Sequence, residues 1–280
     1  MTKLYNRKTK SYVETEQYGN NALIKLYRNK FLLSIATSKI VSDIYGLFTK
    51  TKVSKIMIKK FIKANNIDMT RFKKEKYNSF NDFFIRNLNK INIDKNNNHL
   101  ISPCDSKLIA YKIDNNLNVN IKGIKYTIDE LFDHEHLEKY ENGYMLVFRL
   151  SVDDYHRFCY IDNGEKIKKN TIKGKYHTVS YPSSKYKIYK DNHREYTIMN
   201  THNFGEIIYM EVGALLIGKI VNYDLDTFKR GEEKGYFLPG GSTIVLIVNN
   251  VKIDDDILKN SKKKIETIVN IGEKIGIKQK

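Results

Sequence analysis

The first third of the chain places apolar and basic residues at close to the period of an α-helix. Residues 22–48 and 53–64 each predict a helical stretch, because apolar positions return every three or four residues and lysines fall between them. A third, shorter helix is expected over residues 80–87, with Asn81 as its N-cap. The front of the chain is therefore predicted to be a set of basic amphipathic helices.

From about residue 100 the pattern changes to short apolar runs that are typical of strands. Glycine, asparagine and aspartate separate these runs, as turns require. The expected strands cover residues 108–111, 144–150, 196–199, 207–212 and 242–248. Residues 254–269 return to helical spacing and predict a closing helix.

This order of helices, strands and a last helix predicts an α+β fold. We expect N-terminal amphipathic helices, a β-rich, barrel-like catalytic body and a C-terminal helix. The expected division is a basic helical region over residues 1–75, which docks on a membrane, and a catalytic domain over residues 76–280.

Positive charge is concentrated at the front of the chain. The 280 residues carry a net charge of +17, and residues 1–63 hold 14 Lys and Arg against 3 Asp and Glu. Such an excess points to an anionic partner, either membrane lipid or nucleic acid. The chain shows no zinc-finger spacing and no RNA-binding aromatic signature, so we expect no nucleic acid. An ordinary helical cap with solvated lysines remains the plainer alternative.

Composition favours an intracellular protein that is soluble or peripheral on a membrane. Mean hydropathy is −0.53, and no run approaches the roughly 18 apolar residues of a membrane-spanning helix. The first residues are polar and lack the apolar core of a signal peptide. The two cysteines, Cys104 and Cys159, do not suggest a disulfide framework, and Cys159 is interpreted as a packed thiol.

The most distinctive motif is Gly240-Gly241-Ser242, which leads directly into the apolar run 244–248. Glycine has no Cβ, so the carbonyl of Gly241 is open to attack and its backbone tolerates strained angles. The hydroxyl of Ser242 can reach that carbonyl. This pattern suits a chain that cuts itself before Ser242 and converts the serine into a pyruvoyl group, although a bare Gly-Gly-Ser is also typical of turns.

Two further residues are candidates for the chemistry. His156 follows a strand-like run and is suited to act as a general base near pH 7, or to be a structural hydrogen-bonder. Asp105 lies in a turn and either orients a histidine or caps that turn. His134 and His136 alternate along the chain, but a solvated loop explains them better than a metal site, and no metal is expected.

Six segments between about residues 75 and 250 together resemble the phosphatidylserine decarboxylase family. They are Phe83-Phe84-Ile85-Arg86, Pro103-Cys104-Asp105, Asp154-Tyr155-His156-Arg157, Asn192-His193-Arg194, Val212-Gly213-Ala214 with Ile217-Gly218-Lys219-Ile220, and Gly231-Glu232-Glu233-Lys234-Gly235-Tyr236-Phe237 leading to Gly241-Ser242-Thr243. Three positions depart from the family pattern: Gly240 replaces a leucine, Ser106 a glycine and Cys159 a second histidine. Only His156 remains in its block, so the histidine role is assigned to it.

The resemblance implies a self-processing, pyruvoyl-dependent enzyme. Asp105 orients His156, His156 takes the proton of Ser242, and the chain is cut into residues 1–241 and 242–280, which stay associated. The enzyme then converts phosphatidylserine to phosphatidylethanolamine and CO₂, with His156 as the acid. His177 either contacts substrate or is structural.

The implied location is the cytoplasmic face of the cell membrane, with phosphatidylserine in an anionic bilayer as partner; a homo-oligomer is compatible with the chain. Two alternatives stay open. One is a pyruvoyl decarboxylase for a soluble amino acid, and the other is a basic membrane- or nucleic-acid-binding protein without catalysis.

Overall fold

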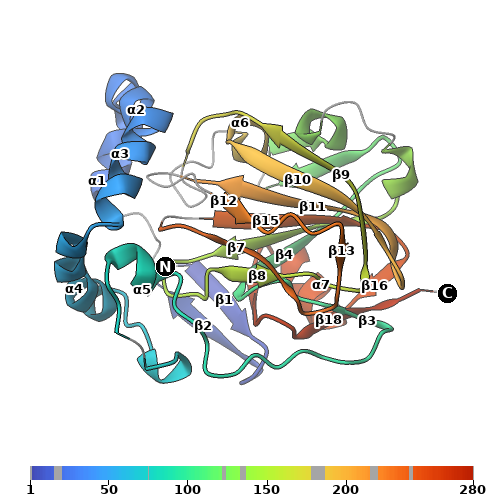
Figure 1. The fold of residues 1–280 in the computed structure, drawn as a ribbon. Coiled ribbons are helices and arrows are strands. Elements are labelled where there is room, and N and C mark those ends of the chain that lie inside the picture. The colour runs from blue at the N-terminus through green and yellow to red at the C-terminus, as the bar shows by residue number, and fades with distance from the viewer. Residues whose placement is uncertain are drawn as a thin grey trace.

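A ten-stranded sheet forms the centre of the molecule (Figure 1). The computed structural model describes residues 2–15, 21–74, 76–121, 124–132, 137–177, 187–214, 220–239 and 242–279. In spatial order the strands are β13 (Thr227–Phe228), β9 (Gly164–Ile172), β10 (Arg194–Thr201), β11 (Gly205–Gly213), β15 (Ser242–Val248), β7 (Tyr144–Leu150), β4 (Ser106–Lys112), β17 (Glu266–Val269), β1 (Thr2–Asn6) and β2 (Ser11–Thr15). Neighbouring strands are antiparallel, except that β1 and β17 are parallel.

Smaller sheets and short helices cover the two faces of this sheet. Two three-stranded sheets contain β3 (His99–Ile101), β16 (Val251–Ile253) and β18 (Lys274–Lys278), and β8 (Arg157–Cys159), β12 (Ile220–Asn222) and β14 (Glu233–Phe237). A hairpin joins β5 (Asn118–Ile121) to β6 (Ile124–Thr127). The helices are α1 (Asn21–Arg28), α2 (Lys30–Ala36), α3 (Lys39–Thr49), η1 (Lys52–Lys55), α4 (Ile56–Ala64), η2 (Met69–Arg71), α5 (Phe80–Phe84), η3 (Ile128–Leu131), η4 (Glu138–Tyr140), α6 (Ile188–Asp191) and α7 (Asp255–Lys262).

Strand β15 lies at the middle of the sheet and is buried on both faces. Ile244, Leu246 and Val248 pack into the core that α7 and the two small sheets cover. Val245 and Ile247 point into the opposite core, which the β5–β6 hairpin, η3 and α6 cover. Successive side chains of a strand alternate between faces, so a strand covered on both sides requires an uninterrupted apolar run.

The α+β prediction is confirmed, but the barrel-like body is not. The sheet is open, with β13 at one edge and β2 at the other. The closing helix over residues 254–269 is wrong in its second half. Helix α7 ends at Lys262, Lys264 takes a positive φ of 59°, and the β-branched residues that follow form β17 between β4 and β1.

The predicted front helices are present, with breaks. Residues 22–48 fall in α1, α2 and α3, and the side chains of Asn29 and Ser38 cap the second and third of these. The cap of α5 is Ser79, whose hydroxyl accepts from the amide of Asp82, rather than Asn81. Residues 2–15 form β1 and β2, so the front of the chain also contributes strands to the central sheet.

Helices α1 to α5 gather at one end of the sheet (Figure 1). The amide of Tyr176 donates to the carbonyl of Thr37, at the end of α2 (3.1 Å). The amide of Phe80 on α5 donates to the hydroxyl of Ser54 on η1 (2.8 Å). An aromatic cluster that includes Phe72, Phe80, Phe83 and Phe84 fills the space between these helices and the body; we call it the Phe cluster.

A buried ion pair lies inside the body. Nζ of Lys234 on β14 is 2.6 Å from a carboxylate oxygen of Glu211 on β11, and both side chains are at most 2% exposed. Burial raises the pKa of Glu211, and the Lys234 charge opposes that rise. Lys234 also donates to the side-chain oxygen of Asn222 (2.8 Å).

We expect Lys234→Met to lower the free energy of unfolding by about 3–5 kcal/mol, because it leaves Glu211 buried without its counter-charge. Urea unfolding followed by circular dichroism measures this loss. The control is the double variant Glu211→Leu/Lys234→Met, which removes both charges and is expected to recover most of the stability. A single variant as stable as the wild type would contradict the expectation.

Candidate active site

Four strand ends meet at the edge of the sheet that faces the N-terminal helices (Figure 1). Ser242 begins β15, where it pairs with Leu150 at the end of β7 and with Gly213 at the end of β11. Strand β4, the other neighbour of β7, begins at the same edge with Ser106. Residues that are far apart in sequence are thereby gathered beside Ser242.

The hydroxyl of Ser242 is buried at the start of β15. The residue is 1% exposed, and its Oγ has no hydrogen-bond partner among the described residues. A buried hydroxyl without a partner is unfavourable by about 1–3 kcal/mol, so such a group calls for an explanation. Gly240 and Gly241, on the other side of the expected cut, lie outside the described residues.

His156 has the state that a general base requires. It is fully buried, and its Nδ1 is 2.9 Å from the carbonyl oxygen of Asp154. A carbonyl can only accept, so Nδ1 carries the hydrogen and the lone pair of the neutral ring is on Nε2. Nε2 has no partner within the described part of the chain. Burial, followed by the charge of Arg86, lowers the pKa of His156 to about 3, so the ring is neutral at pH 7.

Contacts on both sides fix the position of His156. Its ring lies 4.0 Å from the ring of Phe84 in the Phe cluster. Its backbone carbonyl accepts from the amide of Phe237, in the segment that leads to Ser242 (2.9 Å). His156 therefore connects the Phe cluster with the segment that precedes the expected cut.

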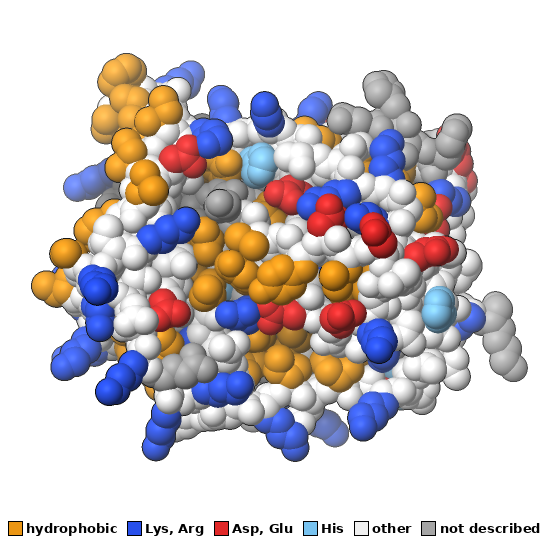
Figure 2. Space-filling view, in the orientation of Figure 1, with side chains coloured by type: hydrophobic (Ala, Val, Ile, Leu, Met, Phe, Trp, Pro, Cys, Tyr) orange, Lys and Arg blue, Asp and Glu red, His pale blue; other side chains and the backbone are white. Residues whose placement is uncertain are grey.

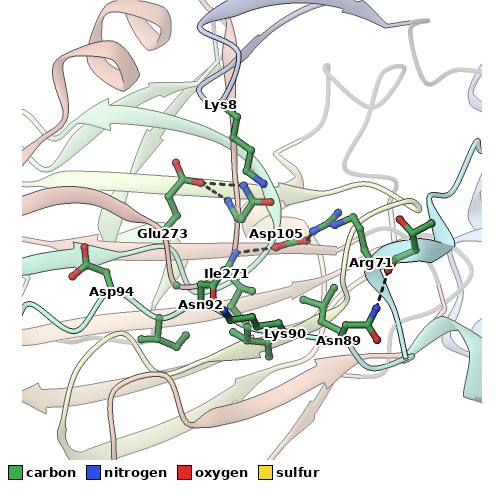
Figure 3. A pocket seen from close by; sticks show the side chains of 15 residues that line it. Lys8, Arg71, Asn89, Lys90, Asn92, Asp94, Asp105, Ile271 and Glu273 are labelled. Atoms are coloured by element: carbon green, nitrogen blue, oxygen red, sulfur yellow. Dashed lines mark hydrogen bonds and ion pairs between the residues drawn. The ribbon is translucent and has the colours of Figure 1, made fainter. Parts of the chain in front are cut away.

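Asp105 is buried but is bonded to groups other than His156. Its Oδ1 accepts from the amide of Ile271 (2.8 Å), and its Oδ2 is 2.5 Å from Nη2 of Arg71 (Figure 3). Burial raises the pKa of Asp105, and the Arg71 charge opposes that rise. Among the described residues no hydrogen bond joins Asp105 to His156; the contact that orients His156 is the carbonyl of Asp154.

A pocket of about 630 Å³ leads to Asp105. Asp105 lies at its inner side between Ile271 and Arg71, and Lys8 and Lys90 line it as well (Figure 3). Neither His156 nor Ser242 lines this pocket, since both are buried under other segments. The pocket therefore gives access to Asp105 and not to the base or the serine.

Lys107 supports the loop that carries His156, and the sequence reasoning missed it. Its buried Nζ donates to both carboxylate oxygens of Asp154, at 2.8 and 2.6 Å. The same carboxylate accepts from the amide of Ser151 (2.6 Å). These bonds tie the turn after β7 to β4. The signal that could have identified Lys107 is a lone lysine inside the apolar strand pattern of residues 106–110.

His177 lies beside the start of β15 because Asn192 holds it there. The side-chain amide of the fully buried Asn192 donates to the carbonyls of His177 (2.8 Å) and of Gly213 (2.7 Å). The oxygen of the same amide accepts from the backbone amide of His177 (3.0 Å). Gly213 pairs with Ser242. Burial, followed by the charge of Lys175, lowers the pKa of His177.

The remaining candidates are His134, His136 and Cys159. His134 and His136 lie outside the described residues. Within the part of the chain that the structure describes, no group of three or more His, Cys, Asp or Glu could hold a metal ion. Cys159 is buried as a free thiol, and burial raises its pKa to about 12, so it stays protonated.

Known proteins match this chain along nearly its whole length. The family model described as phosphatidylserine decarboxylase matches residues 80–277. "Phosphatidylserine decarboxylase proenzyme 2" of Clostridium acetobutylicum is 47% identical and covers 98% of this chain and 97% of its own length. The phosphatidylserine decarboxylase proenzymes of Clostridium tetani and Clostridium botulinum are 45% and 44% identical, and each match covers at least 99% of both chains. The chain belongs to the phosphatidylserine decarboxylase family.

Proposed function

We propose that the chain is a proenzyme that cuts itself between Gly241 and Ser242 and then decarboxylates phosphatidylserine to phosphatidylethanolamine. The observation that carries this proposal is that Oγ of Ser242 and Nε2 of His156 are both buried and have no hydrogen-bond partner among the described residues. Buried side-chain polar atoms are usually hydrogen-bonded, so both atoms call for an explanation. Family membership disfavours the alternative of a basic binding protein without catalysis.

Self-cleavage follows from the state of these two residues. Nε2 of His156 accepts the proton of Ser242, and the Ser242 oxygen attacks the carbonyl of Gly241, so the peptide bond becomes an ester. Loss of the α-proton of residue 242 then expels residues 1–241 as a carboxylate. Hydrolysis of the remaining double bond releases ammonia and leaves a pyruvoyl group.

Asp105 stays in the proposal as the carboxylate of the self-cleavage site. In the structure its oxygens are held by Ile271 and Arg71. It therefore orients His156 only in a conformation in which Arg71 has released it. In the conformation described, Asp154 performs that orientation through its backbone carbonyl.

The surroundings of residue 242 fit a pyruvoyl group. The position is 1% exposed, and a neutral keto group can stay buried where an ammonium would carry a large desolvation penalty. When present, the group supplies an electrophilic carbonyl that draws electrons from the α-carbon of the substrate as CO₂ leaves. For this second stage we propose His156 as the acid; its ring is neutral in the structure, so Nε2 must first take up a proton.

The two products are expected to stay together without denaturant. Residues 242–280 supply β15 and β17 to the interior of the sheet, and Ile244 to Val248 are fully buried. At ~1.5–3 kcal/mol for each buried side chain, these five residues alone contribute on the order of 10 kcal/mol. Size-exclusion chromatography followed by mass spectrometry should show both chains in one peak, and a free short chain in native buffer would contradict this.

The helices at the front of the chain present an exposed apolar surface surrounded by lysines. Figure 2 shows hydrophobic side chains gathered over α2 and α3, with basic side chains around them. Exposed apolar residues of α2, α3 and α4 are Phe31, Leu32, Ile35, Ile40, Ile44, Leu47, Phe48 and Ile56. Apolar patches of this kind with basic neighbours favour an anionic bilayer, and each lysine near such a surface contributes about 1 kcal/mol.

We therefore propose that these helices lie on the cytoplasmic face of the cell membrane, with the sheet edge and its site behind them. Among the described residues no single helix is long and apolar enough to cross a membrane; the pair α2 and α3 meets the criteria together but is bent by 51°. Substitution tests this docking better than truncation, because β1 pairs with β17.

We expect the triple variant Ile40→Ser/Ile44→Ser/Leu47→Ser to be cut normally but to lose about 10-fold or more in binding and turnover of phosphatidylserine vesicles, because it removes three of the four exposed apolar side chains that α3 adds to this surface. These side chains are 62–72% exposed, so the fold should tolerate the change. The matched control is Ile167→Ser/Ile277→Ser, on exposed positions of the body. Unchanged vesicle turnover in the triple variant would exclude docking through these helices and would favour a soluble substrate.

A further inference from the structure

Arg86, just after α5, is a buried cation for which the described residues supply no anionic partner. Its side chain lies in the Phe cluster and is 1% exposed. No carboxylate of the described residues lies within ion-pair distance of its guanidinium, whereas Arg149 pairs with Glu266 and Arg157 with Glu233. Burying a charge without a counter-charge is unfavourable, so the position requires an explanation.

The hydrogen bonds of Arg86 do not explain why its charge is buried. Its Nη atoms donate to the carbonyls of Phe83 and Phe84 at 3.4 Å and to that of Asp153 at 3.3 Å. Its Nε has no partner in the described part of the chain. Arg230, in contrast, donates to three backbone carbonyls at 2.8 Å each. The contacts of Arg86 are at the long limit of hydrogen bonding, which leaves its donors able to take a stronger acceptor.

The guanidinium of Arg86 and the ring of His156, the candidate base, are held by neighbouring residues. Arg86 contacts the carbonyl of Asp153, and His156 contacts that of Asp154, so successive carbonyls of one turn hold the two side chains. The rings of Phe72 and Phe83 lie 4.1 and 4.8 Å from the guanidinium carbon and restrict its plane. Burial lowers the pKa of Arg86 to about 10, so the group still carries its charge at pH 7.

We propose that Arg86 binds the phosphate of the lipid headgroup. The inference rests on the proposed function, which brings a substrate with two anionic groups to this edge of the sheet. One is the carboxylate that leaves as CO₂, and a guanidinium bound to it would stabilise the ground state more than the transition state and would slow the reaction. The phosphate keeps its charge throughout, so a fixed cation can hold it at every stage.

The position of α4 agrees with the assignment of Arg86 to the lipid phosphate. Side chains of α4, including Ile58 and Phe61, pack against the cluster that covers Arg86. The same helix exposes Ile56 on its outer side, within the surface proposed to face the bilayer. Helix α4 therefore lies between the surface proposed to face the bilayer and the cluster that surrounds the guanidinium.

The test compares substrate and product in Arg86→Met and Arg86→Lys. Phosphatidylethanolamine carries the phosphate but no carboxylate, so its inhibition constant in mixed micelles of fixed lipid fraction reports on the phosphate alone. For Arg86→Met we expect self-cleavage to proceed and both the KM for phosphatidylserine and the inhibition constant of phosphatidylethanolamine to rise about 10- to 100-fold, the loss typical of a hydrogen bond to a charged group. Arg86→Lys keeps a charge without the planar fork and should show a smaller rise in both.

Two results would overturn the proposal. A rise in KM without any change in the inhibition constant would assign Arg86 to the carboxylate, and no change in either would leave it a packing residue. Arg86→Lys decides the matter if Arg86→Met does not fold. Arg230→Met is the control, a substitution expected to reduce stability and to leave both constants unchanged. An uncut wild-type chain would instead refute the proposed function, and intact mass detects that separately.

Discussion

Ser242→Ala is expected to remain a single chain of 32.9 kDa and to release no CO₂ from vesicles that contain phosphatidylserine. The hydroxyl is both the nucleophile of the proposed cut and the source of the pyruvoyl group, so no other residue can replace it. The wild type should give two masses, which correspond to residues 1–241 and 242–280. Intact mass spectrometry and trapped ¹⁴CO₂ measure the two effects on the same sample.

The substitution is expected to leave the fold intact, because the hydroxyl it removes has no partner among the described residues. Thr267→Val is a matched control, since Thr267 also has a buried hydroxyl without a described partner, on β17 of the same sheet. That variant should be cut and should turn over lipid as the wild type does. A Ser242→Ala chain that is cut at the same bond, or that decarboxylates lipid while uncut, would refute the mechanism.

The local pattern of the chain predicted many of its elements but not the order of the strands in the sheet. An apolar run identified residues 242–248 as a strand, and helical spacing identified the helices at the front. The predicted barrel-like body was wrong because a closed barrel requires the two edge strands of the sheet to pair with each other. Strand β13 pairs with β9, which is distant in sequence, and β2 forms a hairpin with β1; no local pattern shows whether these two edges meet.

The helix expected over residues 254–269 shows the same limit. Helical and strand spacing overlap in short apolar runs, and pairing with β4 and β1 decided the state of β17. Strands β1 and β2 were missed because they are short and because β1 joins the sheet through β17, near the other end of the chain.

The motifs of the sequence led to Ser242 and His156 as candidates, and their roles stay predictions. Within the described part of the chain, Oγ of Ser242 and Nε2 of His156 have no hydrogen-bond partner. The partners of these residues were not predictable, because they come from tertiary packing. The sequence did not indicate that Arg71 would engage Asp105, that Asn192 would place His177 beside Gly213, or that Arg86 would be buried. Charged side chains are usually exposed, so the sequence alone gives no reason to expect a buried arginine.

His156→Ala is expected to leave most of the protein uncut, with the rate of self-cleavage reduced by about 10²- to 10⁴-fold, the usual contribution of a general base. Nε2 of His156, on the turn after β7, carries the lone pair of the ring and has no partner among the residues that the structure describes. The rate is measured by the appearance of the short chain after synthesis in a cell-free system. His99→Ala is the control: that histidine bonds to Asp94, outside the proposed site, and its loss should leave the rate unchanged.

The pH dependence of self-cleavage gives the same hypothesis a second test. A base acts only when neutral, so its contribution falls as the pH drops through its folded pKa. Because burial and the Arg86 charge lower the pKa of His156 to about 3, the wild-type rate should not fall between pH 8 and pH 5 on account of this residue. A rate that halves near pH 6.5 would show that the reacting histidine is solvated, and a His156→Ala chain cut at the wild-type rate would assign the base to another group.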